Sequence, residues 1–361
     1  MKNSRIERLR KQFDAYYIDA LLVTNDKNIF YLTGFPLMVG DGALLVTKDK
    51  AVMVTDDRYA TALQDFDSDE VVGVITRDYY GAVNKLCAGM KIDVMGFENT
   101  VSFEVYDILN DLMEADIVPC AGMVESLRTV KDPTEIAALR KAADLQSAGY
   151  QHLLAIVHPG MSERQVAVEL DYWMKNHGAQ KASFDTIVAS GENSAKPHAT
   201  VTDRRLQAGD MVTVDFGYYV DGYTADMTRT FAIGEPGEQM RQVYQLVNQA
   251  RQKVIAAAKP GIHGDLLDRA GRSLINDAGY EKEFQHGMGH GIGLSIHELP
   301  LSYGPGRGDV VIDSNQVITV EPGIYVPSVG GVRIEDDLLI TKDGAQRLTT
   351  ADTDLVIIDA K

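Results

Sequence analysis

Residues 286 to 298 read HGMGHGIGLSIHE and contain three histidines, the side chains that most often bind metals or transfer protons at neutral pH. The spacing of His286 and His290 imitates that of a helical zinc motif, but Gly287 stands where that motif needs a glutamate. A phosphate cradle is a poor alternative, because the glycines are not flanked by a strand and a helix in the required order and no P-loop lysine follows. The interleaved glycines favour an extended backbone that a ligand or metal can approach closely.

Four carboxylates lie in two other segments that resemble each other. Asp215 and Asp226 belong to VDFGYYVDGYTADMTRT, and Glu321 and Glu335 belong to VEPGIYVPSVGGVRIEDD. We expect each pair on neighbouring strands of a hairpin, on a buried face. Taken singly, an acidic residue beside glycine is more often a turn residue. Four buried carboxylates near one point would repel one another unless cations neutralise them, so we expect two divalent ions, a bridging water and a neutral histidine as a fifth ligand.

The two acidic segments are part of an internal duplication in the rest of the chain. HPGMSERQVAVELDYWMKNHGA, from His158, and KPGIHGDLLDRAGRSLINDAGY, from Lys259, both predict helices and start 101 residues apart. TVDFGYYV, from Thr213, and TVEPGIYV, from Thr319, follow 106 residues apart. The repeat predicts two α+β halves packed about a pseudo-twofold axis, with their hairpins meeting in a shared sheet and their acids close to the axis.

The first third of the chain predicts a smaller α/β domain. Apolar positions in residues 5 to 17 have helical spacing, and ALLVTN, VVGVITR and DVMGFEN read as strands. GALLVTKDKAVMVTDD predicts a hairpin that turns near Lys48, and SFEVYDILNDLM predicts a helix.

The boundary between the two domains is expected just before a long helix. Asp132 can cap this helix, with Pro133 in its first position and Glu135 in its third. We therefore expect an N-terminal α/β domain over residues 1–125 and a second domain over residues 132–361.

Composition restricts the possible partners and location. The 361 residues are enough for two hydrophobic cores, and the formal net charge of −17 without a Lys/Arg cluster argues against a nucleic-acid partner. No apolar run approaches the ~20 residues that span a bilayer, so no membrane association is expected. Because only Cys87 and Cys120 occur and the N-terminus has no apolar signal-peptide core, we expect the cytoplasm.

These motifs resemble those of the metal-dependent Xaa-Pro peptidases of the pita-bread fold, aminopeptidase P and prolidase, with methionine aminopeptidase more distant. The resemblance covers essentially the whole chain and rests on VDFGYYVDGYTADMTRT, HGMGHGIGLSIHELP, TVEPGIY and GGVRIEDD, which occur in the family's order with similar spacing. It implies an N-terminal α/β domain, a pita-bread catalytic domain with an internal duplication, and a homodimer. The five metal ligands that it implies are Asp215, Asp226, His290, Glu321 and Glu335.

The resemblance also implies roles for residues outside the ligand set. His198, in AKPHAT, and His297, in SIHELP, match the family's two substrate-binding histidines and would take part in catalysis. Glu321 would move a proton while it remains a ligand. His286 matches a histidine near the leaving-residue pocket, and Arg333 matches an arginine near the metal centre.

The implied reaction is hydrolysis of the N-terminal Xaa-Pro bond in proline-containing peptides or dipeptides. The oxygen-rich ligand set favours two manganese ions, with cobalt or zinc as possible substitutes. A metal-free creatinase-type hydrolase and a non-catalytic binding protein are disfavoured, because all five ligand types are present.

Two features of the sequence favour different substrate lengths. YLTGFPLMVGDGALLVTKDKAVMVTDDRY resembles the small bacterial aminopeptidases P, so we expect cleavage of Xaa-Pro-Xaa tripeptides at least as efficiently as of dipeptides. The alternative is a prolidase restricted to dipeptides. It is suggested by Arg307, fourteen residues before Glu321, where some prolidases carry an arginine that binds the free carboxylate of a dipeptide. The competing interpretation of Arg307 is a solvated loop residue between two glycines.

Overall fold

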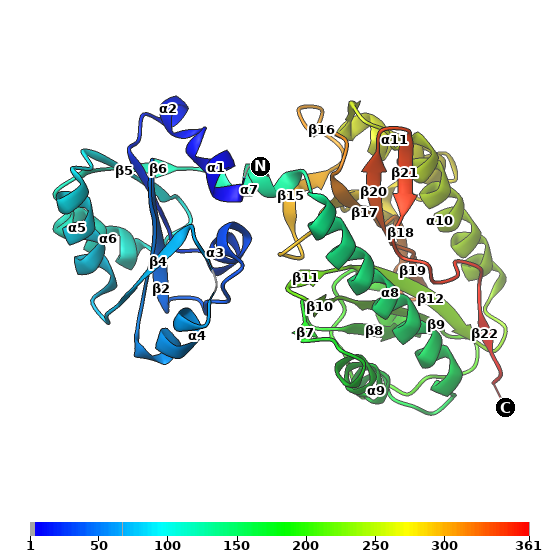
Figure 1. Cartoon of the computed structure of the whole chain (residues 1–361). Coiled ribbons are helices and arrows are strands. Elements are labelled where there is room, and N and C mark those ends of the chain that lie inside the picture. The colour runs from blue at the N-terminus through cyan, green and yellow to red at the C-terminus, as the bar shows by residue number, and fades with distance from the viewer. Residues whose placement is uncertain (1–3, 67, 361) are drawn as a thin grey trace. The chain divides into compact units, whose positions relative to one another are not determined.

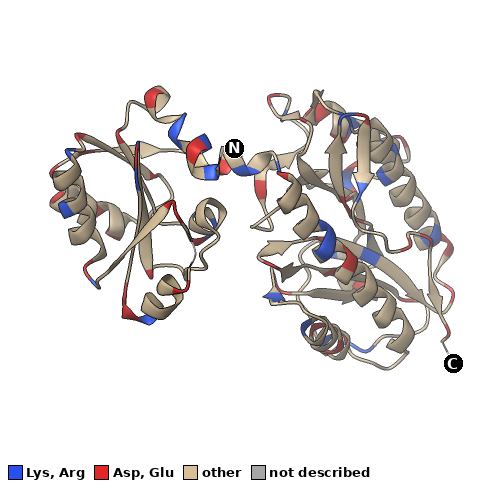
Figure 2. Ribbon diagram, in the orientation of Figure 1, with Lys and Arg blue, Asp and Glu red and all other residues tan. Residues whose placement is uncertain are grey.

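The computed structural model describes residues 4–66 and 68–360 and divides into two compact units, Met1–Arg128 and Thr129–Lys361, each with its own core (Figure 1). None of the helices in the described ranges has both the length and the apolar composition that a bilayer crossing needs. Basic and acidic residues are interspersed over the helices of both units (Figure 2).

The first unit is built on a mixed six-stranded sheet in the order β4-β3-β2-β1-β5-β6. Its strands are β1 (Ala20–Val23), β2 (Gly42–Thr47), β3 (Ala51–Thr55), β4 (Val71–Ile75), β5 (Val94–Glu98) and β6 (Asp116–Cys120). Its helices are α1 (Arg5–Arg10), α2 (Phe13–Tyr16), α3 (Asp26–Thr33), α4 (Ala60–Gln64), α5 (Tyr79–Met90), α6 (Phe103–Leu112) and α7 (Met123–Thr129), with a 3₁₀ turn at Asp57–Tyr59. The strands, the hairpin of β2 and β3, and the helix α6 agree with the sequence-based prediction.

The helical spacing over residues 5 to 17 corresponds in the structure to two short helices, not to one continuous helix. The second helix ends at Tyr16 and is followed by the cap residue Tyr17, whose backbone is left-handed with φ of 55°. By contrast, the cap predicted for the long helix α8 (Pro133–Ile156) is confirmed. The Asp132 side chain accepts from the backbone N–H of Glu135, and the Glu135 side chain accepts from the N–H of Asp132.

The second unit contains two layers of strands that correspond to the two predicted halves. The first is the sheet β22-β12-β9-β8, and the second is the sheet β15-β14-β17-β20-β21. Their strands are β8 (Ile187–Ser190), β9 (Met211–Phe216), β12 (Met227–Ile233), β22 (Ile357–Ile358), β14 (Gly289–Gly291), β15 (Glu298–Tyr303), β17 (Val317–Val320), β20 (Asp336–Thr341) and β21 (Gly344–Arg347).

Two helices pack against each sheet, because this packing buries the apolar faces of both the helices and the sheet. The first sheet packs against α8 and α9 (Glu163–Asn176), and the second packs against α10 (Glu238–Ala257) and α11 (Gly264–Asp277), which lie side by side (Figure 1). The helices α9 and α11 begin five residues after His158 and Lys259, where the prediction placed their starts, since both segments open with a turn.

The expectation of one shared sheet is wrong. Each predicted hairpin is broken at its acidic residues into an outer strand pair, β9 with β12 or β17 with β20, and an inner pair. The inner pairs are β10 (Tyr218–Val220) with β11 (Tyr223–Thr224), and β18 (Gly323–Val326) with β19 (Gly330–Arg333). The two sheets are joined where the Glu335 N–H donates to the carbonyl of Thr228 at 3.0 Å.

The remaining elements are short. They are the strands β7 (Lys181–Ala182), β13 (Ile262–His263) and β16 (Val311–Ile312) and the 3₁₀ turns η2 (Gly191–Ala195) and η3 (Glu281–Glu283).

Candidate metal centre and active site

The four acidic residues lie where the long hairpins break. Asp215 is in β9, and Asp226 directly precedes β12, which pairs with β9. Glu321 directly follows β17, and Glu335 directly precedes β20, which pairs with β17. At the first break, Gly217 leaves no room for a side chain, since a Cβ there would lie 2.3 Å from Ser183 Oγ and 2.9 Å from the Ala225 carbonyl. The local backbone therefore brings both acids of each half to the same sheet end.

The two halves hold each other's acids in a reciprocal way. The Thr228 hydroxyl, in the first half, donates to Glu335 Oε2 at 2.7 Å. The backbone N–H of Asp226 donates to Asp337 Oδ2, in the second half, at 3.0 Å. In both directions, the residue that makes the contact stands two positions after an acid of its own half. These two hydrogen bonds therefore join the two halves at corresponding positions of the repeat.

Three of the five predicted ligands form a compact buried group. Donor atoms of Asp226, His290 and Glu335 all lie within 4.8 Å of one another. The Nε2 atom of His290 lies 3.7 Å from Asp226 Oδ2 and 3.8 Å from Glu321 Oε1. Asp215 lies outside the group of three but lines the same cavity.

The carboxylates of this group lack the positive charge that their burial requires. Burial, reinforced by the neighbouring acids, raises the pKa of Asp226 and of Glu335 well above the usual range, and burial raises the pKa of Glu321 to about 8 although Arg333 opposes this. The Oδ1 atoms of Asp215 and Asp226 are buried and have no hydrogen-bond partner in the described chain. Unpaired buried carboxylate oxygens are costly, so the donor set fits hard divalent cations.

His290 presents the ring nitrogen that a metal needs. Its Nδ1 lies 3.0 Å from the Gly291 carbonyl, which fixes the proton on Nδ1 and leaves Nε2 as an acceptor facing the carboxylates. Burial and the neighbouring His297 lower the pKa of His290 to about 4, so the ring is neutral at pH 7. The backbone of His290 lies in β14, as the glycine-rich sequence predicts.

Arg333 is the cation that holds Asp215. Its Nη2 donates to Asp215 Oδ2 at 2.6 Å, and both side chains are buried. Its other donors reach the Tyr325 hydroxyl at 2.7 Å, Thr228 Oγ1 at 3.1 Å and the Pro197 carbonyl at 3.2 Å. The guanidinium therefore orients one predicted ligand, Asp215. Through the Pro197 carbonyl it also binds the loop that carries His198.

His286 has both of its ring nitrogens engaged within the protein. Nδ1 lies 2.8 Å from the Gly287 carbonyl, and Nε2 lies 2.9 Å from the Tyr325 hydroxyl. Burial, together with Arg333, lowers the pKa of His286 to about 3. The neutral ring therefore accepts the hydroxyl proton of Tyr325, and it can meet a substrate only through its carbon edge.

One cavity of about 320 Å³ brings the predicted residues together. It is lined by Asp215, Asp226, His290, Glu321, Glu335, His198, His297, His286 and Arg333. The ring of His297 lies 4.2 Å from that of His290, centre to centre, whereas His198 approaches from the other half of the repeat on an exposed loop. Apolar wall residues include Phe184, Ile187 and Leu301. A second cavity of about 460 Å³ adjoins the first, shares His286, Gly287 and Ser302 with it, and is lined by Arg307.

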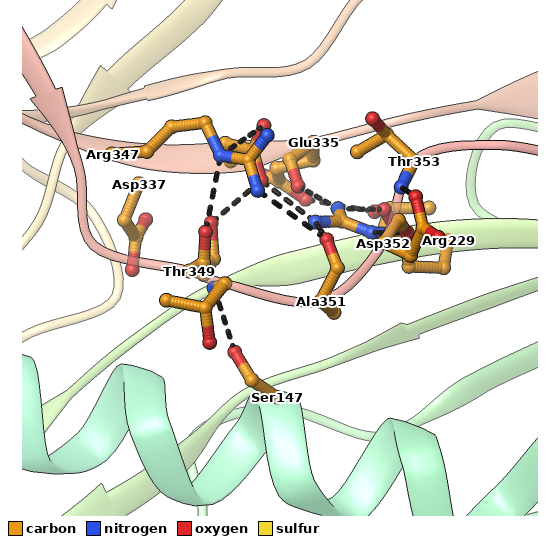
Figure 3. A network of polar contacts seen from close by, with 12 residues as sticks. Ser147, Arg229, Glu335, Asp337, Arg347, Thr349, Ala351, Asp352 and Thr353 are labelled. Carbon is orange, nitrogen blue, oxygen red and sulfur yellow. Dashed lines mark hydrogen bonds and ion pairs between the residues drawn. The ribbon is translucent and has the colours of Figure 1, made fainter.

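A buried charge network lies behind Glu335 (Figure 3). The Arg229 guanidinium donates to the carbonyl of Glu335 and to that of Thr228, and its Nη2 donates to Asp336 Oδ1 at 2.7 Å. Arg251 donates to the other oxygen of Asp336, and Thr349 adds a hydroxyl at 2.6 Å. The backbone of Glu335 is therefore fixed from the side away from the cavity.

Sequence reasoning missed several residues that support this site. Tyr325 links His286 to Arg333, and the duplication offered a signal for it, because Tyr325 aligns with Tyr219 in the repeat. For the Arg229 and Asp336 pair no signal existed, since the partners are 107 residues apart.

Comparison with known proteins agrees with this site. Residues 137–342 match the metallopeptidase family M24, and residues 5–130 match the creatinase/prolidase N-terminal domain. Because the first match covers more than half of its length, the chain belongs to the metallopeptidase family M24 and has the pita-bread fold. The expected family and fold class are thereby confirmed, and so is the expectation of divalent metal ions at this coarse level.

Individual relatives cover nearly the whole chain. A solved Xaa-Pro dipeptidase from Bacillus anthracis is 38% identical with a TM-score of 0.93, covering 98% of this chain and 99% of its own. The Xaa-Pro dipeptidase of Pyrococcus horikoshii is 33% identical over 356 residues, covering 98% of this chain and 99% of the relative. A solved X-Pro aminopeptidase from Thermotoga maritima is 32% identical with a TM-score of 0.89, covering 98% and 100%.

Proposed function

We propose that this metallopeptidase is an Xaa-Pro dipeptidase that works with two divalent ions, preferably manganese. The observation that carries the proposal is one cavity lined by the five candidate ligands, by the two histidines expected to bind substrate, and by Arg333. The aminopeptidase expectation from the sequence gives way to its alternative, because the comparisons support a dipeptidase better. The metal-free and non-catalytic alternatives lose their support with membership of a metallopeptidase family.

Arg307 supports the restriction to dipeptides. Its side chain is exposed and has no hydrogen-bond or ion-pair partner among residues 4–66 and 68–360. It lines the cavity that adjoins the active site at His286 and Ser302. A guanidinium in that position can form two parallel, charge-assisted hydrogen bonds with the free C-terminal carboxylate of an Xaa-Pro dipeptide. A longer peptide would leave the guanidinium without that carboxylate.

The residues of the chain divide the work of hydrolysis. When bound, two divalent ions lower the pKa of a shared water toward neutrality and polarise the scissile carbonyl. Glu321 accepts the proton of the attacking water and passes it to the proline nitrogen as the C–N bond breaks. His198 and His297, one from each half of the repeat, hold the substrate backbone and the developing oxyanion. Arg333 keeps Asp215 in place throughout.

The ligand set would be shared between the halves. Asp215, Asp226, His290, Glu321 and Glu335 would hold the ions. Oxygen donors with a single neutral histidine suit manganese better than thiolate-binding zinc. Cobalt and zinc remain substitutes to be compared.

Substrate length is tested by kcat/KM for an Xaa-Pro dipeptide and an Xaa-Pro-Xaa tripeptide with the same first residue. We expect the wild type to prefer the dipeptide, and Arg307→Ala to lose this preference by about tenfold or more, because an ionic pair is removed. Arg269→Ala, an exposed arginine on α11, is the control and should leave the ratio unchanged. Equal use of both substrates by the wild type would restore the aminopeptidase interpretation.

Location and assembly complete the proposal. Cys87 and Cys120 are both buried free thiols, which suits a reducing cytoplasm. We expect a homodimer, as the sequence resemblance implies. Light scattering coupled to size-exclusion chromatography tests the assembly, and a mass of 39.6 kDa would show a monomer instead.

A further inference from the structure

A fully buried carboxylate outside the metal centre holds both ends of one loop. Glu163, the first residue of α9, is 0% exposed. One of its oxygens accepts from the Ser190 N–H at 2.7 Å and from the Ser190 hydroxyl at 2.8 Å. The other accepts from the Thr202 N–H at 3.0 Å and from the Thr202 hydroxyl at 2.6 Å. The Asn193 amide adds contacts of 3.2 and 3.0 Å to the two oxygens.

The loop between these anchors carries His198. The His198 side chain is exposed, and no residue of the described ranges forms a hydrogen bond with its ring. Its position therefore depends on the backbone on either side of it. That backbone is fixed by Glu163 at Ser190 and Thr202, and by Arg333, which donates to the Pro197 carbonyl at 3.2 Å.

In the second half of the repeat, a carboxylate at a different position binds the segment that carries His297. The position equivalent to Glu163, 101 residues later, is Gly264, where a Cβ would lie only 2.9 Å from the Tyr303 Cβ. Beside His297, the buried Glu298 accepts from the Ser295 N–H at 3.0 Å and pairs with Lys131 at 3.4 Å. The repeat itself therefore does not require an acid at the start of its helix, and each half has its own carboxylate for the segment that carries its histidine.

We propose that Glu163 is a positioning residue that fixes His198 against the substrate, an inference that rests on the proposed peptidase function. A histidine that acts on a transition state must be held within a fraction of an ångström, and a loop alone does not provide this. Glu163 supplies the rigidity through hydrogen bonds to neutral donors at both loop ends, without touching the substrate itself.

The first experiment replaces the carboxylate by its amide. Glu163→Gln keeps the size of the side chain but turns one oxygen into a donor that faces other donors. We expect kcat/KM for an Xaa-Pro dipeptide to fall by about 10- to 100-fold, while the metal content per chain stays at the wild-type value. Glu169→Gln, on the exposed face of the same helix, is the matched control and should be unchanged.

A double-mutant cycle tests whether the effect acts through the histidine. If Glu163 works by positioning His198, then Glu163→Gln should cost almost nothing more in a His198→Ala background. Losses that multiply in the double variant would overturn the proposal, since they would show a merely structural role. Normal turnover of His198→Ala would overturn it as well and leave the peptidase function intact. A wild type without any Xaa-Pro hydrolysis would remove the proposed function and this inference together.

A milder pair of variants guards against a folding defect in Glu163→Gln. Thr202→Val removes the hydroxyl that donates to Glu163 and accepts from the Arg204 N–H, and Thr202→Ser keeps it. We expect reduced kcat/KM in the valine variant and recovery in the serine variant. The NMR signal of the His198 ring, assigned from its absence in His198→Ala, should shift with Thr202→Val and not with Glu169→Gln. An unmoved signal together with unchanged activity would refute the proposal.

Discussion

Replacement of Asp336 by asparagine should destabilise the catalytic unit strongly, although the side chain faces away from the cavity. Its carboxylate is 0% exposed and pairs with Arg229 and Arg251, which are 1% and 2% exposed. Asparagine would leave two buried guanidinium groups without a counter-charge. Breaking a buried pair in this way costs about 3–5 kcal/mol of unfolding free energy, and Arg347, one-third exposed, adds little.

The expected magnitude can be converted into a melting temperature. For a domain of about 200 residues, each kcal/mol corresponds to about 2–4 °C, so Asp336→Asn should lower the Tm by about 6–20 °C. Calorimetry in the presence of a chelator is the suitable assay, because bound metal would otherwise stabilise the folded state. The control is Asp343→Asn, an exposed aspartate in the next turn, which should shift the Tm by less than about 2 °C.

The same variant predicts a dependence on pH. Burial by itself would raise the pKa of Asp336, but Arg229, Arg251 and Arg347 more than offset it and hold the pKa below its ordinary value. A carboxyl with a depressed folded-state pKa stabilises the fold above the unfolded pKa, near 3.9, and this stabilisation is lost as the pH falls through the folded value. The difference between wild type and Asp336→Asn should therefore be full at pH 7 and shrink below about pH 4. Equal melting temperatures at pH 7 would refute the reasoning.

Three further predictions concern the metal centre. Chelation should abolish hydrolysis and added manganese should restore it, measured with one dipeptide substrate; full activity of metal-free protein would contradict the proposal. Asp226→Asn should lower the metal content found by elemental analysis well below that of Glu238→Gln, an exposed control, because a ligand of the compact buried group is lost. His290→Ala should lose metal, whereas His297→Ala should keep it and lose about 10²-fold in kcat; metal loss in both variants would place His297 in the ligand set.

The chemistry of the site could be predicted from the sequence, because it depends on which residue types occur and on their spacing. Acids and histidines recur at duplicated positions, and the structure places Asp226, His290 and Glu335 within reach of a common ion. The helix cap at Asp132 was equally predictable, because its partners lie within three residues of one another. Local patterns of this kind need no knowledge of the fold.

The parts that could not be predicted depend on contacts between distant segments. Arg251 and Asp336 are 85 residues apart, and one sequence holds no record of such a pair. The break of each long hairpin depends on what surrounds it, as the crowding at Gly217 shows. The proposed preference for dipeptides rests on the position of Arg307 beside a second cavity, which spacing along the chain does not reveal.

The reciprocal bonds between Thr228 and Glu335 and between Asp226 and Asp337 have a consequence for cooperativity. Neither half orients its own acids completely, so the ion-binding geometry exists only when both halves are folded and in register. Metal affinity then reports on the contact between the two halves, and a change that loosens this contact should weaken ion binding.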